Sequence, residues 1–158
     1  MPALDVLKLW QRCSGSAIGR WLFSRLVCFK APYFSSVRPV FDELEVGHSV
    51  ARMKKRRAVQ NHIGTVHVIA IANLCEFIAG ILTEASVPKS MRWIPRGMNI
   101  QYLAKAATNL RATGKLPAIT ESEPHDVVVS VDVLDTAGTV VVHADITMYI
   151  TPRKTAQG

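Results

Sequence analysis

Cysteine is scarce in this 158-residue chain, and its three thiols lie far apart. Cys13, Cys28 and Cys75 form no CxxC pair, and no set of His, Cys and Asp residues has the spacing of a metal site. An odd number of thiols in mostly apolar surroundings is typical of reduced, buried cysteines in a cytoplasmic protein. The sequence therefore predicts no disulfide framework and no bound metal, and it favours a cytoplasmic location.

Acidic residues are also in short supply. Twelve Asp and Glu residues stand against 19 Lys and Arg, which gives a net charge of +7. A basic protein attracts anions such as nucleic acid, membrane surfaces or phosphorylated ligands, coenzyme A (CoA) among them. No platform of interleaved aromatic and basic residues is present, which argues against nucleic-acid binding. The basic run Lys54–Arg57 and Arg96 could meet CoA phosphates, or they could be solvated surface charges.

The sequence lacks the layout of a secretion signal. Residues 4–30 have the periodicity of a helix, with a break near Ser14–Ser16. The helix ends at Ala31-Pro32, because a residue that precedes proline disfavours the helical conformation. Charged residues interrupt this segment, so it contains no apolar signal-peptide core. We expect it to pack on the rest of the protein, with binding to a membrane surface as the alternative.

The longest apolar run is too short and too interrupted to be a convincing membrane span. Val66–Leu82 is 17 residues long and contains His67, Asn73 and Glu76, whereas a bilayer requires about 20 predominantly apolar residues. A helix that is apolar on nearly all sides is buried in a protein core. The sequence therefore predicts a buried central helix over Val66–Glu84 and no transmembrane segment.

Several segments alternate apolar and polar residues with the period of two that a strand requires. The signal is strongest over 126–134 and 139–150, which a turn at Asp135–Gly138 joins. Further strands are predicted over the ranges 37–46, 49–57, 92–104 and 107–113. Consecutive strands with short links form an antiparallel sheet, and one face of that sheet needs cover. We therefore expect one α+β domain over 1–158, with a helical N-terminal segment over 1–32 and a loose tail over 152–158.

Glu76 is the residue of the central helix that most needs an explanation. A buried carboxylate is costly without partners or a function, and burial would suit it to general-base chemistry. A structural carboxylate that binds a strand or a second subunit is the alternative. Asn73 and Gly80 lie three residues before and four residues after Glu76, on the same face of the helix. Asn73 could orient the carboxylate and Gly80 could admit another backbone, or both could be packing features.

A polar loop precedes the central helix and contains Asn61, Gly64, Thr65 and His67. Free backbone N–H groups at a helix N-terminus can bind an anion or a developing oxyanion. An ordinary capping loop with Thr65 as the N-cap is the alternative. His67 precedes Glu76 by nine residues, which on a helix is roughly 13.5 Å and two and a half turns. The two residues therefore lie on opposite faces, and a site that uses both would need two chains.

Asn61, Gly64, His67 and Glu76 stand at offsets of 0, 3, 6 and 15. This spacing resembles the Asn-x-x-Gly-x-x-His-Gly-Gly…Asp/Glu pattern of phenylacetyl-CoA-type hotdog thioesterases. The segments WIPRGMNIQYLAKA and VVVSVDVLDTAGTVVVHADI are similar to the later strands of that family, and the chain most resembles a bacterial branch of unknown function. The resemblance covers almost the whole sequence. It implies a hotdog fold, a homodimer or dimer of dimers, and hydrolysis of an acyl-CoA thioester without a further cofactor.

The resemblance also implies roles for individual residues. Glu76 would activate water or attack the thioester, the Val68 amide would polarise the thioester carbonyl, and Asn61 and His67 would shape the site or position water. The remaining residues expected to contact the substrate are Gly64, Thr65 and Asn73. The chain departs from the pattern because His67-Val68-Ile69 stands in place of His-Gly-Gly. A valine at the second position narrows the approach of a substrate to the backbone.

Two other functions stay open. His62 precedes Glu76 by fourteen residues, which is similar to the His…Glu spacing of hotdog acyl-carrier-protein dehydratases. The proline- and glycine-rich segment of those enzymes is absent here, so this function ranks lower. The third possibility is an acyl-CoA-binding protein without catalysis, and the valine at position 68 is the best support for it.

Overall fold

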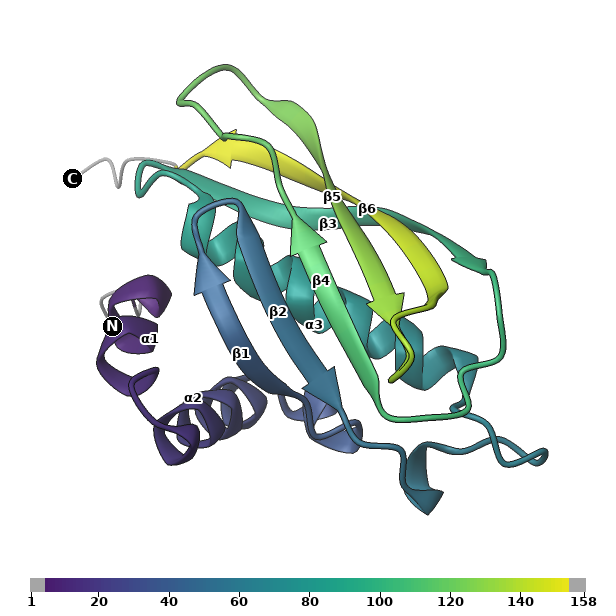
Figure 1. Cartoon of the computed structure of the whole chain (residues 1–158). Helices are drawn as coiled ribbons and strands as arrows, with labels where there is room; N and C mark the ends of the chain where they lie inside the picture. The colour runs from purple at the N-terminus through teal and green to yellow at the C-terminus, as the bar shows by residue number, and fades with distance from the viewer. Residues whose placement is uncertain (1–4, 154–158) are drawn as a thin grey trace.

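A curved sheet of six antiparallel strands wraps around one long central helix, as Figure 1 shows. The computed structural model describes residues 5–153. The strands are β1 (Val40–Glu45), β2 (His48–Met53), β3 (Met91–Tyr102), β4 (Leu110–Lys115), β5 (His125–Leu134) and β6 (Val140–Pro152). Their order across the sheet is β1-β2-β4-β5-β6-β3. The α+β architecture expected from the sequence is therefore confirmed, and β3 lies at an edge of the sheet although it directly follows the central helix.

The central helix α3 (Val68–Ser86) lies against the concave face of the sheet. Its buried residues are Ile71, Asn73, Leu74, Cys75, Phe77, Ile78, Ala79, Gly80, Leu82 and Thr83. By length and composition alone α3 could cross a membrane, but more than half of it is buried inside the protein. It is the core helix of the domain, as the sequence predicts.

The two faces of β6 differ as the alternating sequence predicts. Ala144, Ile146 and Met148 are buried beneath α3. On the opposite face, His143 Nδ1 lies 2.7 Å from Asp132 Oδ1 of β5, and His143 Nε2 lies 3.5 Å from Asp145 Oδ1. The hydrogen bond with Asp132 raises the pKa of His143 above its usual value, and the charge of Asp145 acts in the same direction.

Two helices precede the sheet and cover β1, as Figure 1 shows. Helix α1 (Val6–Cys13) has Asp5 as its N-cap, whose side chain accepts from the Lys8 amide, and α2 (Ala17–Lys30) has Ser16 as its N-cap. Within α2, the Ser24 hydroxyl donates to the Arg20 carbonyl at 2.8 Å and accepts from the Phe41 amide of β1 at 2.9 Å. The expected break between two helices is confirmed, and a short 3₁₀ helix η1 (Pro32–Ser36) follows.

Several boundaries differ from the sequence-based expectations. β1 begins at Val40 because Arg38 has a positive φ of 50° and Pro39 has no N–H to donate. Helix α3 begins at Val68 rather than Val66, since its N-cap is His67 and not Thr65. β6 continues through Pro152, so the expected loose tail begins inside a strand. Residues 1–4 and 154–158 lie outside the described residues.

Candidate functional site

Glu76 lies halfway along α3, and its side chain is exposed in the single chain. Its neighbours Cys75 and Phe77 are fully buried, because they turn toward the sheet while Glu76 turns away from it. Within residues 5–153 no side chain forms a hydrogen bond or an ion pair with its carboxylate. The expected burial of Glu76 is therefore wrong for one chain alone. The helix is apolar on nearly every side, yet the sheet covers only part of its circumference.

The Val68 amide lies at the N-terminus of α3, where the first N–H groups have no partner within the helix. His67 Nδ1 accepts from the Ile69 amide at 3.1 Å, and the His67 carbonyl accepts from the Ile71 amide at 3.2 Å. Among the described residues, no acceptor forms a hydrogen bond with the Val68 amide. The positive end of the helix dipole therefore includes an unpaired N–H that could bind an anion. The Val68 side chain stands exposed beside it.

The loop before α3 is closed by its own hydrogen bonds. Asn61 Oδ1 accepts from the amides of Ile63 and Thr65 at 3.1 Å each, and Asn61 Nδ2 donates to Thr65 Oγ1 at 2.7 Å. Gly64 has a φ of 80°, a conformation that glycine adopts without strain. Asn61, Gly64 and Thr65 thus form one compact turn. Asn61 can influence a site through the shape of this loop, since both of its side-chain polar atoms are already engaged there.

Asn73 does not orient Glu76. Its Nδ2 donates to Ser36 Oγ at 3.0 Å and to the Tyr33 carbonyl at 3.4 Å, so the buried side chain joins α3 to η1. In the described part of the chain, Asn73 Oδ1 has no hydrogen-bond partner. The side chain lines a hollow of about 200 Å³ together with Tyr33, Ser36, Gln60, His67 and other neighbours. His67 and Asn73 are therefore brought together at one end of α3.

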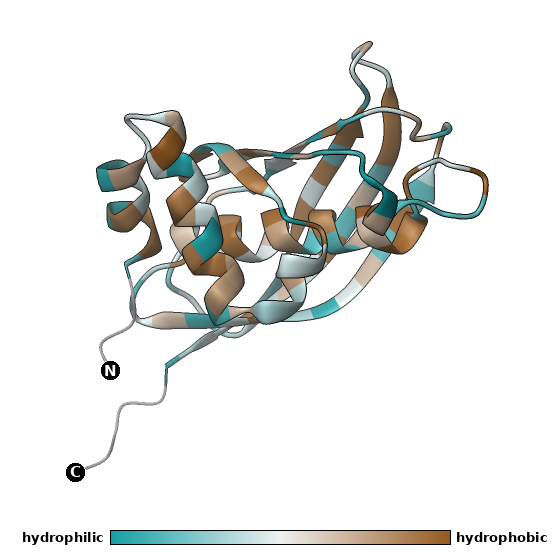
Figure 2. Cartoon of the chain, turned by 90° about the horizontal axis from the view of Figure 1, so that it is seen from below, coloured by the Kyte–Doolittle hydropathy of each residue, from teal (hydrophilic) through white to brown (hydrophobic). Residues whose placement is uncertain are grey.

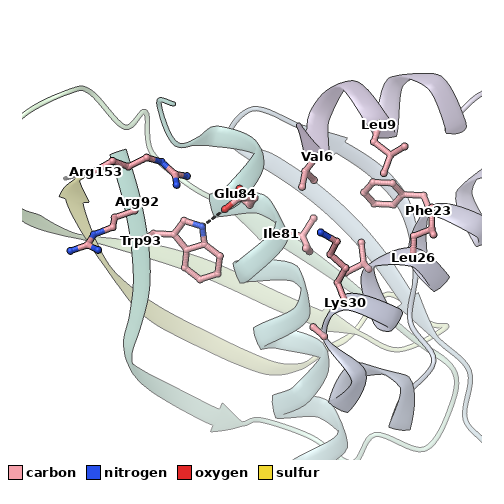
Figure 3. Close-up of a pocket in the computed structure, with 12 residues that line it drawn as sticks. Val6, Leu9, Phe23, Leu26, Lys30, Ile81, Glu84, Arg92, Trp93 and Arg153 are labelled. Carbon is pink, nitrogen blue, oxygen red and sulfur yellow. Dashed lines mark hydrogen bonds between the residues drawn. The ribbon is translucent and has the colours of Figure 1, made fainter. Parts of the chain in front are cut away.

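A larger hollow of about 510 Å³ lies at the other end of α3, between α1, α2 and β3 (Figure 3). Apolar side chains form most of its wall, among them Val6, Leu9, Phe23, Leu26, Ile81 and Trp93. Basic residues, Lys30, Arg92 and Arg153, also line it. Sequence reasoning missed this hollow because its walls come from four elements that are distant in the chain.

Trp93 stands beside α3 because Gly80 has no side chain. A Cβ atom at Gly80 would lie 3.3 Å from Trp93 Cη2, and Trp93 Nε1 donates to Glu84 Oε2 at 2.6 Å. The expectation that Gly80 admits a neighbour holds for an aromatic ring rather than for another backbone. Asn73 lines the smaller hollow and Ile81 lines the larger one. Along the axis of α3, Asn73 lies roughly 4.5 Å before Glu76 and Ile81 roughly 7.5 Å after it.

Arg96 lines neither of these two hollows. Its guanidinium contacts both carboxylate oxygens of Asp126 at 3.0 and 3.1 Å, and it lies 3.9 Å from the centroid of the Tyr149 ring. Tyr149 belongs to the face of β6 opposite the buried Met148 and Ile150. Arg96 therefore lies on the outer face of the sheet, away from α3. One chain alone therefore does not bring Arg96 and Glu76 together, and the expected contact between Arg96 and a substrate stays a prediction.

The basic run at the end of β2 is partly engaged. Lys55 Nζ donates to the Ala107 carbonyl at 2.9 Å, and Arg56 Nη2 donates to the Ser36 carbonyl. Lys54 and Arg57 are exposed. Two of the four cations thus hold surrounding loops, and two remain accessible to an anion. Within the described ranges, no group of three or more His, Cys, Asp or Glu side chains could hold a metal ion.

A family model described as a domain of unknown function, DUF4442, matches residues 19–150. The chain belongs to the DUF4442 family. This DUF4442 protein is similar to a solved structural-genomics target, APC5556, with 37% identity, a TM-score of 0.82, and coverage of 96% of this chain and 100% of the other. No match was found among proteins with curated functions.

More distant structures share the fold of this DUF4442 protein. A thioesterase from Haemophilus influenzae is 14% identical, with a TM-score of 0.69 and coverage of 96% and 94% of the two chains. A hypothetical thioesterase from Streptococcus pneumoniae, solved with coenzyme A, is 20% identical, with a TM-score of 0.67 and coverage of 81% and 99%. At such identities the similarity establishes the hotdog fold alone.

Proposed function

We propose that this DUF4442 protein hydrolyses acyl-CoA thioesters and that Glu76 is its catalytic carboxylate. The observation that carries the proposal is the place of Glu76, an exposed and unpaired carboxylate on the core helix of a hotdog fold, with a hollow on either side. A structural carboxylate would bind a strand of its own chain or a second subunit, and within residues 5–153 Glu76 has no partner in its own chain. The thioesterases with the same fold, one of them solved with coenzyme A, support the choice of substrate.

A second copy of the chain completes the proposed site. β3 is a twelve-residue edge strand with exposed Ile94 and Met98, and a long apolar edge is normally paired or covered. Pairing of β3 with the same strand of a second copy would give a two-fold symmetric dimer with a continuous sheet. The Val68 amide and Glu76 lie too far apart on one helix to act on one carbonyl group. The second copy would supply the missing amide and remove Glu76 from bulk water.

In the proposed reaction, the Glu76 carboxylate accepts a proton from water while the water oxygen attacks the thioester carbonyl carbon. The Val68 N–H of the other copy stabilises the negative charge that develops on the carbonyl oxygen. The carbon–sulfur bond then breaks, and the departing thiolate takes up the proton from Glu76. In the second form of the mechanism the carboxylate itself attacks, and water hydrolyses the resulting anhydride. Both forms release a free acid and CoA, and both require Glu76.

The two hollows differ in chemistry, which favours one direction for the substrate. The larger hollow is mainly apolar and suits the acyl group, since burial of its methylene groups is favourable. The smaller hollow is lined by polar residues such as Gln60, His67 and Asn73. It suits the amide-containing arm of CoA, which needs hydrogen-bond partners.

The test compares Glu76→Gln with the wild type on short, medium, long and aromatic acyl-CoAs, with thiol release as the readout. A positioned general base contributes roughly 100- to 10,000-fold, so we expect kcat to fall by about that factor while the dimer persists. Glu45→Gln is the matched control, because Glu45 is also exposed but lies at the end of β1 rather than on α3. Full activity in Glu76→Gln would refute the mechanism.

Other outcomes distinguish the competing functions. Interconversion of 3-hydroxyacyl and enoyl thioesters without thiol release would show a dehydratase. Saturable binding of acyl-CoA without turnover would show a binding protein. A monomer at micromolar concentration in sedimentation would refute the shared site, even if hydrolysis occurs.

A further inference from the structure

Helix α2 buries one face and leaves a second apolar face uncovered. Phe23, Ser24 and Cys28 are buried beneath it. The opposite side carries large apolar side chains with the following exposed fractions: Ile18 73%, Trp21 50%, Leu22 48%, Leu26 50% and Phe29 84%. We name these five residues the outer stripe of α2. Apolar residues dominate α2 in the view from below in Figure 2. Contiguous apolar patches of this kind are rare on soluble monomers unless they bind something.

The outer stripe is set among positive charges. Between residues 5 and 38 the chain has one acidic residue, Asp5, and six basic residues, which are Lys8, Arg12, Arg20, Arg25, Lys30 and Arg38. Asp5 already pairs with Lys8 at 3.6 Å and with Lys89 at 3.4 Å. The segment that carries the stripe therefore has a clear excess of basic residues, and Lys30 and Arg38 among them are exposed. Apolar side chains with flanking cations match an anionic lipid surface, which offers acyl chains beneath phosphate groups.

A second copy of the chain is a poorer occupant of this surface. A two-fold symmetric contact places the same patch of both copies together. Lys30, which is exposed at the end of α2 beside Phe29, would then be brought close to the cations of the partner. Such a contact brings like charges together as water is excluded, which is unfavourable. An anionic surface gains from the same charges.

We propose that the outer stripe of α2 docks the protein on anionic membranes. The stripe would enter the boundary between headgroups and acyl chains, where Trp and Tyr side chains are favoured. Tyr33, just beyond the helix, is also exposed. Leu26 and Lys30 also line the larger hollow, so the docked surface is continuous with the mouth of the proposed acyl site. The docking itself does not depend on the thioesterase activity.

The test is co-sedimentation of the full chain with phosphatidylcholine vesicles, with and without phosphatidylglycerol. We expect binding to the anionic vesicles that is at least tenfold tighter than to neutral ones and that weakens with salt. The double variant Leu22→Glu/Phe29→Glu should bind at least tenfold more weakly. The control Val46→Glu/Val128→Glu adds the same charge at two exposed apolar positions, one in the turn between β1 and β2 and one on β5, and should bind within about twofold to threefold of the wild type.

Tryptophan fluorescence locates the contact. Trp21 is half exposed whereas Trp10 is buried, so anionic vesicles should shift the emission to shorter wavelength in the wild type and in Trp93→Phe but not in Trp21→Phe. Equal binding to both kinds of vesicle would refute the electrostatic part of the proposal. Absence of binding would overturn the proposal, and so would an equal loss in the control variant. If the stripe variant instead dissociates the oligomer of a protein that ignores vesicles, the stripe is a subunit contact.

Discussion

Gly114 of β4 has no room for a side chain, because α3 crosses the sheet at that point. A Cβ atom there would lie 2.5 Å from Ile78 Cγ2, 3.0 Å from Ser49 Oγ and 3.2 Å from Leu82 Cδ2. Ile78 is fully buried, and its Cγ2 branches from Cβ in a helix that allows essentially one rotamer. The methyl group cannot rotate away, so Gly114→Ala must push α3 off the sheet.

The magnitude follows from two opposing effects. Excess volume in a packed core lowers the free energy of unfolding by about 1–3 kcal/mol. Alanine also restricts the unfolded chain more than glycine does, which raises the free energy of unfolding by about 0.4–1 kcal/mol. We therefore expect Gly114→Ala to lower the free energy of unfolding by about 1–2 kcal/mol. For a domain of this size, that loss lowers Tm by roughly 2–8 °C. Urea unfolding at one fixed protein concentration measures it, because the stability of the proposed dimer would depend on concentration.

Two comparisons isolate the steric cause. Gly15→Ala adds the same methyl group where no atom lies within 4 Å, and it should change the stability by less than about 0.5 kcal/mol. Ile78→Ala removes the clashing Cγ2 at its own cost of about 2–5 kcal/mol. In that background Gly114→Ala should cost clearly less than in the wild type, which a double-mutant cycle detects. Wild-type stability of Gly114→Ala, or an equal cost in both backgrounds, would refute the packing argument.

Two further predictions concern polar groups. Since the pKa of His143 is raised in the folded state, its contribution is fully present below the unfolded value of 6.5 and is lost as pH rises through the raised value. The stability difference between the wild type and His143→Gln should therefore shrink from about pH 5.5 to about pH 8.5, a window that brackets histidine titration. Urea titrations at several pH values measure this difference, and a constant or growing difference would contradict the prediction. Ser24→Ala should lower the free energy of unfolding by about 1–3 kcal/mol, because the buried Phe41 amide loses its acceptor. Ser24→Thr keeps a hydroxyl group and should lower the free energy of unfolding by less. Equal losses in the two variants would indicate a purely steric effect.

Local sequence signals were sufficient for most of the fold. The alternation over β5 and β6 follows from the period of the side chains, and the break before α2 follows from the capping residue Ser16. The start of α3 was misplaced because Val66 is apolar and buried although it belongs to the loop. Its amide donates to the Ala106 carbonyl at 2.8 Å, a contact between distant parts of the chain.

The candidate site was harder to predict because its geometry depends on contacts between distant segments. The spacing pattern singled out Glu76, but only the packing of the sheet shows that its side chain turns outward. Asn73 and Glu76 share a helix face in an ideal projection, yet η1 takes the amide of Asn73 for its own hydrogen bonds. The charge of Arg96 alone suggests a place in the site, whereas Arg96 occupies a bulge of β3 and its guanidinium binds Asp126 on the outer face.

The position of β3 also determines when the domain can finish folding. β3 leaves α3 directly, but its sheet partner is β6, so Met91 pairs with Pro152 and Tyr102 with Val142. As the chain is synthesised, β3 must wait with both edges unpaired until three further strands have been made. Closing such a long loop costs conformational entropy before any contact between the two strands forms, and this cost slows folding. The β3–β6 seam should therefore be the last part of the sheet to close, and the nascent domain offers chaperones an open strand until then.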